Sequence, residues 1–166
     1  MIKPKVQDAL NEQIKHELYS SYVYLAVSAY CHTISLPGFA HWFSLQSAEE
    51  REHAMKIYEF ILDRGGHVKL HALEAPASEY GTPLQIAEKT LEYERRVTAQ
   101  IEKLYELAVN EGDYPAQVML QWFINEQVEE EKNAQLLIDQ LKMVGDNRAA
   151  LLMLDMELGK RVGEGG

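Results

Sequence analysis

The chain has 166 residues and a formal net charge of −10 at pH 7, so it is long enough for one domain with a buried core and carries no positive excess. That charge argues against binding to nucleic acid or to an anionic membrane, because both need Lys and Arg facing the phosphates. The single cysteine, Cys31, excludes a disulfide framework, and neither a signal-peptide pattern nor a long apolar span is present, so we expect a cytoplasmic location.

The first two predicted helices cover residues 5–33 and 37–64. The turn sequence TISLPG separates them, Pro37 suits the first turn of the second helix, and Gly65-Gly66 ends it. Because this connection is short, we expect the two helices to be antiparallel.

Three further helices are predicted at 83–111, 114–144 and 146–160. The third helix of the chain opens with a capping box, in which Thr82 is the N-cap and Gln85 sits three residues later, with Pro83 between them. Gly112 and Gly145 punctuate the later boundaries.

The segment GHVKLHALEAPASEYG between the second and third helices is long for a bundle connection. A helix of this size is roughly 40 Å long at about 1.5 Å per residue, and an extended segment of this length reaches up to ~55 Å. It can therefore run the length of the bundle and set those helices parallel. We predict an all-α fold with one domain over residues 1–166: a four-helix bundle with a long crossover and a short fifth helix.

Ligand-capable residues lie at matching depth on the inward seams of all four long helices. Stepping by three and four residues along each seam places Glu17, Glu50, Glu94 and Gln127 near the midpoints of their helices. Midpoints superpose whichever way a helix runs, so these side chains should meet inside the bundle. His53 and Glu130 lie one turn away on the same faces.

Burying these carboxylates is expensive, since each ion in the interior costs several kcal/mol unless it is paired. The four seams contain no Lys or Arg, which leaves protonated acids or bound cations as the two solutions. Any one seam glutamate is more simply explained by a misplaced seam, and a Glu–His pair by a wet surface. Four coincident positions favour a site for divalent metal such as iron, manganese or zinc.

Further acids flank the predicted metal layer. Glu126 and Glu129 in NEQVEEEK are three residues apart, and Glu49 precedes Glu50. Such a run is usually a solvated helix face, but here it is placed to hold an additional, weaker cation. Tyr24 lies two turns beyond Glu17 and is either an ordinary core tyrosine or a hydrogen-bond or electron donor beside the metals.

Segments from all four long helices carry a specific resemblance. The stretches IKHELYSSYVY, SAEEREHA, LEYE and WFINEQVEEEK resemble those of bacterial and archaeal non-haem ferritins, members of the ferritin-like di-iron family. The similarity extends over nearly the whole chain, including the crossover and the fifth helix.

The resemblance implies roles for individual residues. Glu17, Glu50 and His53 look like the ligands of one iron, with Glu50 bridging to a second iron held by Glu94, near Gln127 and Glu130. Tyr24 resembles the tyrosine beside the centre. The set implied for catalysis is therefore Glu17, Tyr24, Glu50, His53, Glu94 and Gln127. The set that resembles a third iron site is Glu49, Glu126, Glu129 and Glu130.

The implied function is ferroxidase activity with iron storage: Fe(II) is oxidised by dioxygen or hydrogen peroxide, and ferric mineral is stored inside a homo-oligomeric shell of twenty-four subunits. Glu52 stands where bacterioferritins place a haem-binding methionine, so we expect no haem. The alternative is a rubrerythrin-like di-iron peroxidase or oxidoreductase. That class carries a second Glu-x-x-His on the fourth helix, where this chain has Gln127-Val-Glu-Glu130. A metal-free interaction bundle is disfavoured because its buried acids would be uncompensated.

Overall fold

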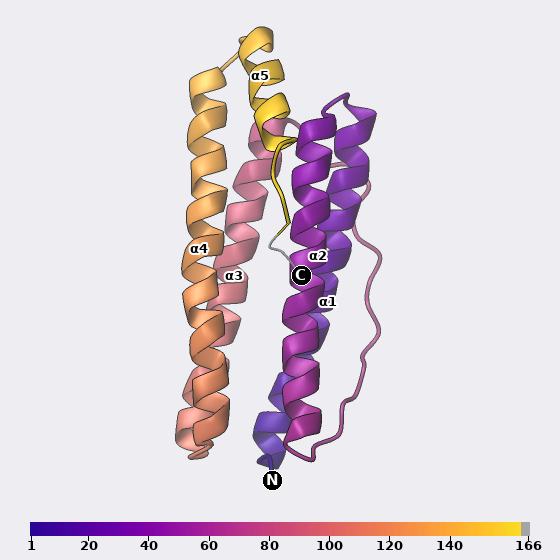
Figure 1. Ribbon diagram of the computed structural model, residues 1–166. Coiled ribbons are helices and arrows are strands. Elements are labelled where there is room, and N and C mark those ends of the chain that lie inside the picture. The colour runs from indigo at the N-terminus through magenta and orange to yellow at the C-terminus, as the bar shows by residue number, and fades with distance from the viewer. Residues whose placement is uncertain (164–166) are drawn as a thin grey trace.

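Five helices and no strand are found in residues 1–163, the part of the chain described by a computed structural model (Figure 1). The helices are α1 (Pro4–Thr33), α2 (Pro37–Asp63), α3 (Pro83–Asn110), α4 (Tyr114–Val144) and α5 (Arg148–Leu158). All-α architecture is confirmed, and each boundary lies within two residues of the expected one.

Side-chain caps fix several of these boundaries. Thr82 accepts a hydrogen bond from the Gln85 backbone, and the Gln85 side chain accepts one from the Thr82 backbone, which completes the predicted capping box. Asp113 and Asn147 cap α4 and α5 in the same way. Gly145, with φ of 53°, ends α4 in a conformation that glycine adopts without steric cost.

The long crossover runs along the bundle from the end of α2 to the start of α3 (Figure 1). Consequently α2 and α3 point the same way, as the reach of the segment predicted, while α1–α2 and α3–α4 are antiparallel pairs. Asn11 on α1 anchors the segment by donating to the His67 carbonyl at 3.1 Å and accepting from the Lys69 amide at 2.9 Å.

Two apolar clusters fill the bundle on either side of its middle. One contains Phe39, Phe43 and Leu137, and the other contains Leu10, Ile57 and Phe123. The buried stripes are not wholly apolar: Gln13 and Ser20 on α1 are buried, while Ser21 and Thr98 are half-buried. The layer between the clusters is polar, and this is where the candidate site lies.

The fifth helix packs against α2 and α4. Asp155 on α5 is buried and accepts a hydrogen bond from the Phe39 amide at 2.9 Å, so it caps the beginning of α2 from another element. The other face of α5 exposes Leu152, Met153 and Met156. Within residues 1–163, no helix is both long enough and apolar enough to cross a membrane.

Candidate metal centre

Residues from all four long helices converge in the polar middle layer. Each is 5% exposed or less, and the set comprises Glu17, Glu50, His53, Glu94, Gln127 and Glu130. They lie on the core-facing stripe because helical periodicity continues through the layer: the apolar residues one or two turns before and after each of them are also buried. The sequence-predicted layer therefore exists.

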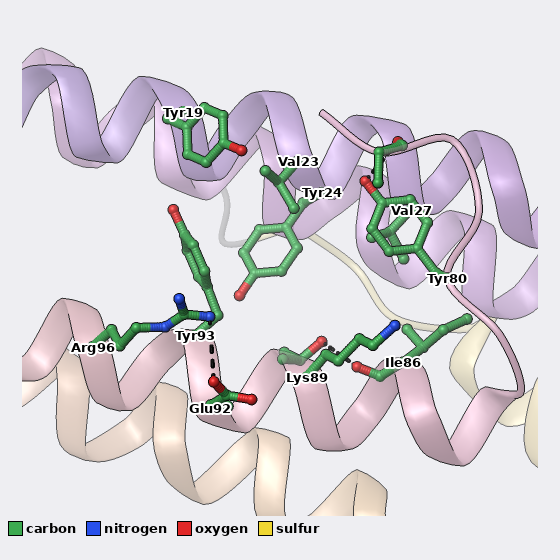
Figure 2. A pocket seen from close by; sticks show the side chains of 12 residues that line it. Tyr19, Val23, Tyr24, Val27, Tyr80, Ile86, Lys89, Glu92, Tyr93 and Arg96 are labelled. Carbon is green, nitrogen blue, oxygen red and sulfur yellow. Dashed lines mark hydrogen bonds and ion pairs between the residues drawn. The ribbon is translucent and has the colours of Figure 1, made fainter. Parts of the chain in front are cut away.

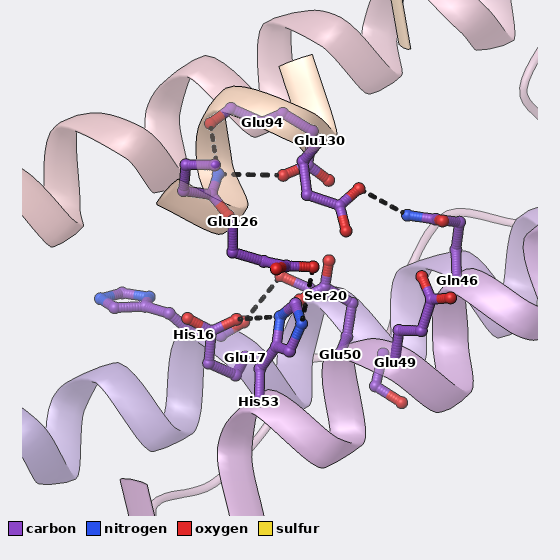
Figure 3. A network of polar contacts seen from close by, with 12 residues as sticks. His16, Glu17, Ser20, Gln46, Glu49, Glu50, His53, Glu94, Glu126 and Glu130 are labelled. Carbon is purple, nitrogen blue, oxygen red and sulfur yellow. Dashed lines mark hydrogen bonds and ion pairs between the residues drawn. The ribbon is translucent and has the colours of Figure 1, made fainter. Parts of the chain in front are cut away.

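His53 joins two groups of acidic side chains (Figure 3). Its Nδ1 lies 3.4 Å from a Glu50 oxygen and 3.9 Å from a Glu17 oxygen, and its Nε2 lies 3.8 Å from Glu126. One potential ligand atom from each of Glu17, Glu50 and His53 falls within 4.8 Å of the others, and the same holds for His53, Glu126 and Glu130. Such spacing suits a shared cation.

Neutral donors orient the buried carboxylates. Gln13 donates to Glu17 at 2.8 Å, and Gln46 donates to Glu130 at 2.9 Å. Glu94 accepts from Gln127 at 3.2 Å and also from the Tyr24 hydroxyl. Among residues 1–163, no Lys or Arg forms an ion pair with these three acids or with Glu50. The carboxylates are thus held in place without having their charge neutralised.

Burial and mutual repulsion disfavour the ionised acids. Burial, followed by the charges of Glu94 and Glu17, raises the pKa of Glu50 well above its usual range. Burial likewise raises the pKa of Glu94 to about 7, although the hydrogen bonds from Tyr24 and Gln127 oppose it, and that of Glu130 to about 8. Without a cation, protons stabilise this cluster.

The donor set suits ferrous or ferric iron. It offers carboxylate oxygens and one imidazole, which are ligands for divalent and trivalent first-row metals. If Glu17, Glu50, Glu94 and Glu130 are ionised, their four negative charges balance the four positive charges of two divalent cations. The same layer would be poorly suited to an uncharged ligand, since it lies between apolar clusters and holds four acids.

The flanking acids are placed differently from one another. Glu126 is half-buried beside His53, whereas Glu129 is exposed and belongs to neither of the two groups found in residues 1–163. Glu49 is half-buried and accepts two hydrogen bonds from Arg161. The structure therefore brings Glu126 and Glu130 together, while the joining of Glu49 and Glu129 to them as one site stays a prediction.

A pocket of about 400 Å³ lies between α1, α3 and the crossover (Figure 2). Tyr24 and Tyr93 form part of its wall, with ring centroids 6.2 Å apart, and Tyr80 comes from the crossover. Tyr24 thus lies between this pocket and Glu94, to which its hydroxyl donates. Burial and the nearby Glu94 raise the pKa of Tyr24, so it remains a proton donor.

Sequence reasoning did not assign several residues that shape the centre. Gln13 precedes Glu17 by one turn, and Gln46 precedes Glu50 by one turn. Their spacing from the acids was the available signal. Trp122 packs edge-on against His53 with ring centroids 5.3 Å apart. For Arg161 no periodic signal existed, because it follows the last helix.

Known proteins match this chain over nearly its full length. Residues 7–144 match the ferritin-like domain family. Bacterial non-heme ferritins from Bacteroides fragilis strain 638R and Staphylococcus aureus strain USA300 are 40% and 38% identical, each over 97% of this chain and over 100% and 97% of their own. An open-pore ferritin from the archaeon Archaeoglobus fulgidus superposes with a TM-score of 0.96 at 44% identity, covering 98% of this chain and 100% of that one. With the four-helix fold, the long crossover and the buried acidic layer, these matches show that the chain belongs to the ferritin family.

Proposed function

We propose that this protein oxidises Fe(II) at the mid-bundle centre and stores the ferric product inside a shell of twenty-four copies. The observation that carries the proposal is the placement of Glu50. This buried carboxylate lies 3.4 Å from His53 Nδ1 and shares a ligand group with Glu17 and His53, and its pKa is raised by burial and then by the charges of Glu94, Glu17 and Glu130. A carboxylate in that position is suited to bridge two ferrous ions.

The reaction moves one electron from each of two ferrous ions to one dioxygen molecule. With two protons, the dioxygen becomes hydrogen peroxide, and the two irons become ferric. Each ferric ion then reacts with two water molecules to give one ferric oxide-hydroxide unit and three protons. Hydrogen peroxide serves as an alternative oxidant, since one molecule accepts two electrons and two protons to form two waters.

The residues contribute chiefly through charge. Hard carboxylate oxygens stabilise Fe(III) more than Fe(II), so Glu17, Glu50 and Glu94 favour the loss of an electron. His53 supplies the one imidazole to the α2 side of the layer. Gln127, a neutral amide where related di-iron enzymes have a stronger ligand, leaves the second position less tightly bound and lets the product depart.

Storage requires an enclosed volume that a single subunit does not supply. The exposed face of α5, with Leu152 60% and Met153 69% exposed, gives each copy an apolar surface to bury against others. The structural neighbours are ferritins, which supports assembly into a closed particle. Particle mass measured by light scattering should equal twenty-four times the 19.0 kDa of one chain.

Aerobic addition of Fe(II) to purified apoprotein tests the function. We expect the oxidation rate to exceed that in buffer, and we expect the particle to retain far more than two irons per subunit in soluble form. Absorbance of ferric iron follows the rate, and metal analysis of the isolated particle gives the stoichiometry.

The stoichiometry also separates the competing functions. A di-iron oxidoreductase would stop near two irons per subunit, and a metal-free bundle would oxidise Fe(II) no faster than buffer. Either result would overturn the proposal. Glu88→Ala, which removes an exposed acid from α3, is the matched control and should behave as the unmodified protein does.

A further inference from the structure

Arg161 holds a carboxylate at the edge of the metal layer. Its Nη2 lies 2.9 Å from both side-chain oxygens of Glu49, so a single nitrogen sits between the two oxygens. That arrangement resembles the way a carboxylate chelates a metal cation through both oxygens. While Arg161 occupies this position, neither oxygen of Glu49 is fully available to a metal.

The segment after α5 delivers Arg161 to this position. It descends beside α2 toward the middle of the bundle (Figure 1). The His41 Nε2 and the Arg161 carbonyl are 2.7 Å apart, and the guanidinium lies 4.7 Å from the ring centroid of Trp42. A further hydrogen bond of 3.4 Å joins Arg161 to the Trp42 carbonyl. The contact is therefore built from several interactions rather than one surface ion pair.

Glu49 shares a hollow with the centre. The hollow measures about 510 Å³, lies between α2 and α4, and is lined by Glu49 together with His53, Glu126 and Trp122. Figure 3 shows Glu49 and Gln46 on the same helix, close to Glu50 and Glu130. Gln46 donates to Glu130, while its own buried Oε1 has no partner among residues 1–163. An additional cation would find oxygen ligands here once Glu49 is released.

We propose that Arg161 is an internal counter-cation that competes with metal for Glu49 and so weakens cation binding on the α2–α4 side of the centre. This inference rests on the proposed function, because it concerns iron that has left the two metal positions proposed for the mid-bundle centre. The side chains of Arg161 and Glu49 are 22% and 14% exposed, so water can solvate the arginine when a metal displaces it. Arg161 acts as a positioning residue and touches no reacting atom.

Anaerobic Zn²⁺ titration by calorimetry tests this competition without any oxidation. Arg161→Gln should tighten the weakest class of Zn²⁺ sites by about tenfold or more, which is the usual scale for groups next to metal ligands. Lys160→Gln removes the neighbouring exposed cation, which pairs with Glu157, and should change nothing. The double variant Glu49→Gln with Arg161→Gln should lose the gain.

A second measurement leaves Arg161 intact and therefore does not depend on how its variants fold. In a Trp122→Phe protein, Trp42 is the only tryptophan, and the guanidinium stacked on it should leave when Zn²⁺ takes Glu49. We expect Trp42 fluorescence to change after the first two equivalents per subunit have bound.

The outcomes distinguish this inference from the proposed function. If Arg161→Gln binds Zn²⁺ as the unmodified protein does, or if the gain survives in the double variant, competition by Arg161 is wrong. A Trp42 signal that is absent or complete within the first two equivalents also overturns it. In all these cases two tight sites per subunit would still be seen, whereas their absence would contradict the di-iron centre itself.

Discussion

The two faces of the bundle surround the same buried centre with different residues. On the α1–α3 face, Tyr24 and Tyr93 line an apolar pocket, and Tyr24 and Gln127 donate to Glu94. On the α2–α4 face, acids line the hollow beside His53, and Arg161 provides a cation from outside the bundle. Neutral donors hold acids of the centre on both faces, since Gln46 on α2 donates to Glu130, and the α2–α4 face also places Glu126 and Glu49 beside His53.

The two faces therefore offer different surroundings to a bound cation. A cation would gain few ligands toward the α1–α3 face, where aromatic and aliphatic side chains line most of the pocket and Lys89 and Arg96 are also present. Toward the α2–α4 face it would meet Glu126 and Glu49, although Arg51 and Lys56 also line that hollow.

Glu50→Ala removes the carboxylate that we propose to be common to both metal positions and should have the largest effect. Loss of several kcal/mol of charge stabilisation, at a factor of ten for every 1.4 kcal/mol or so, should lower the initial rate of Fe(II) oxidation by roughly 100-fold or more. Stopped-flow absorbance of ferric iron measures it. The apoprotein should melt at the same temperature or higher, because a buried acid is gone. An oxidation rate close to that of the unmodified protein would contradict a role for Glu50 in the centre.

The stability of the apoprotein should fall as the pH rises from 5 to 8.5. The pKa values of Glu94 and Glu130 are raised by folding to about 7 and about 8, so the folded state holds protons that the unfolded state has released. That stabilisation is complete below the unfolded pKa near 4.5 and is lost through the folded values. Each pKa unit corresponds to about 1.4 kcal/mol. Chemical unfolding at both pH values measures the loss.

Zn²⁺ should reduce this pH dependence, since a cation replaces the protons that the acids need. The matched control is the Glu94→Gln and Glu130→Gln double variant, in which the layer no longer titrates at these two positions. An apoprotein equally stable at both pH values would show that the acids are solvated or otherwise paired.

Gln127→His would give the α3–α4 side of the centre a second imidazole and make the two metal positions more alike. A stronger ligand should hold ferric iron longer, so release from the centre should slow by about tenfold, the lower end of the range for changes around metal ligands. Recovery of the fast oxidation phase after a first dose of two irons per subunit measures release. Gln121→His, at an exposed position on α4, is the control. Unchanged recovery would contradict a role for the weak amide.

Tyr24→Phe tests the α1–α3 face and should have the smallest effect. It removes the hydroxyl that donates to Glu94, so the pKa of Glu94 should rise further and its ionised form should become scarcer. Since one such hydrogen bond is worth about 1 kcal/mol, a few-fold slower oxidation near neutral pH is expected. Tyr93→Phe is the control, because the Tyr93 hydroxyl contacts Ser20 at 2.9 Å and no acid of the centre. Equal rates in the two variants would argue against Tyr24 as a donor to the centre.

The sequence by itself determined the helices, their order and the depth of the acids. Helix boundaries followed from local chemistry, as at Thr82 and Gln85, where the cap and its partner are three residues apart. Glu17, Glu50 and Glu94 were found because a buried stripe repeats along each helix, and helix midpoints coincide in a bundle of equal rods. The length of the crossover alone set α2 parallel to α3, as the structure confirms.

Only the tertiary structure decided which neutral groups donate hydrogen bonds to those acids and which residues line the pocket on each face. The pairing of Tyr24 with Glu94 joins residues 70 positions apart, and that of Gln46 with Glu130 joins residues 84 positions apart. Arg161 is the extreme case, since it meets Glu49 from 112 positions away on a segment without helical periodicity. Periodicity fixes which way a side chain points within its own helix, whereas its partner on another element depends on how the elements dock, and that is set by the packing of the whole core.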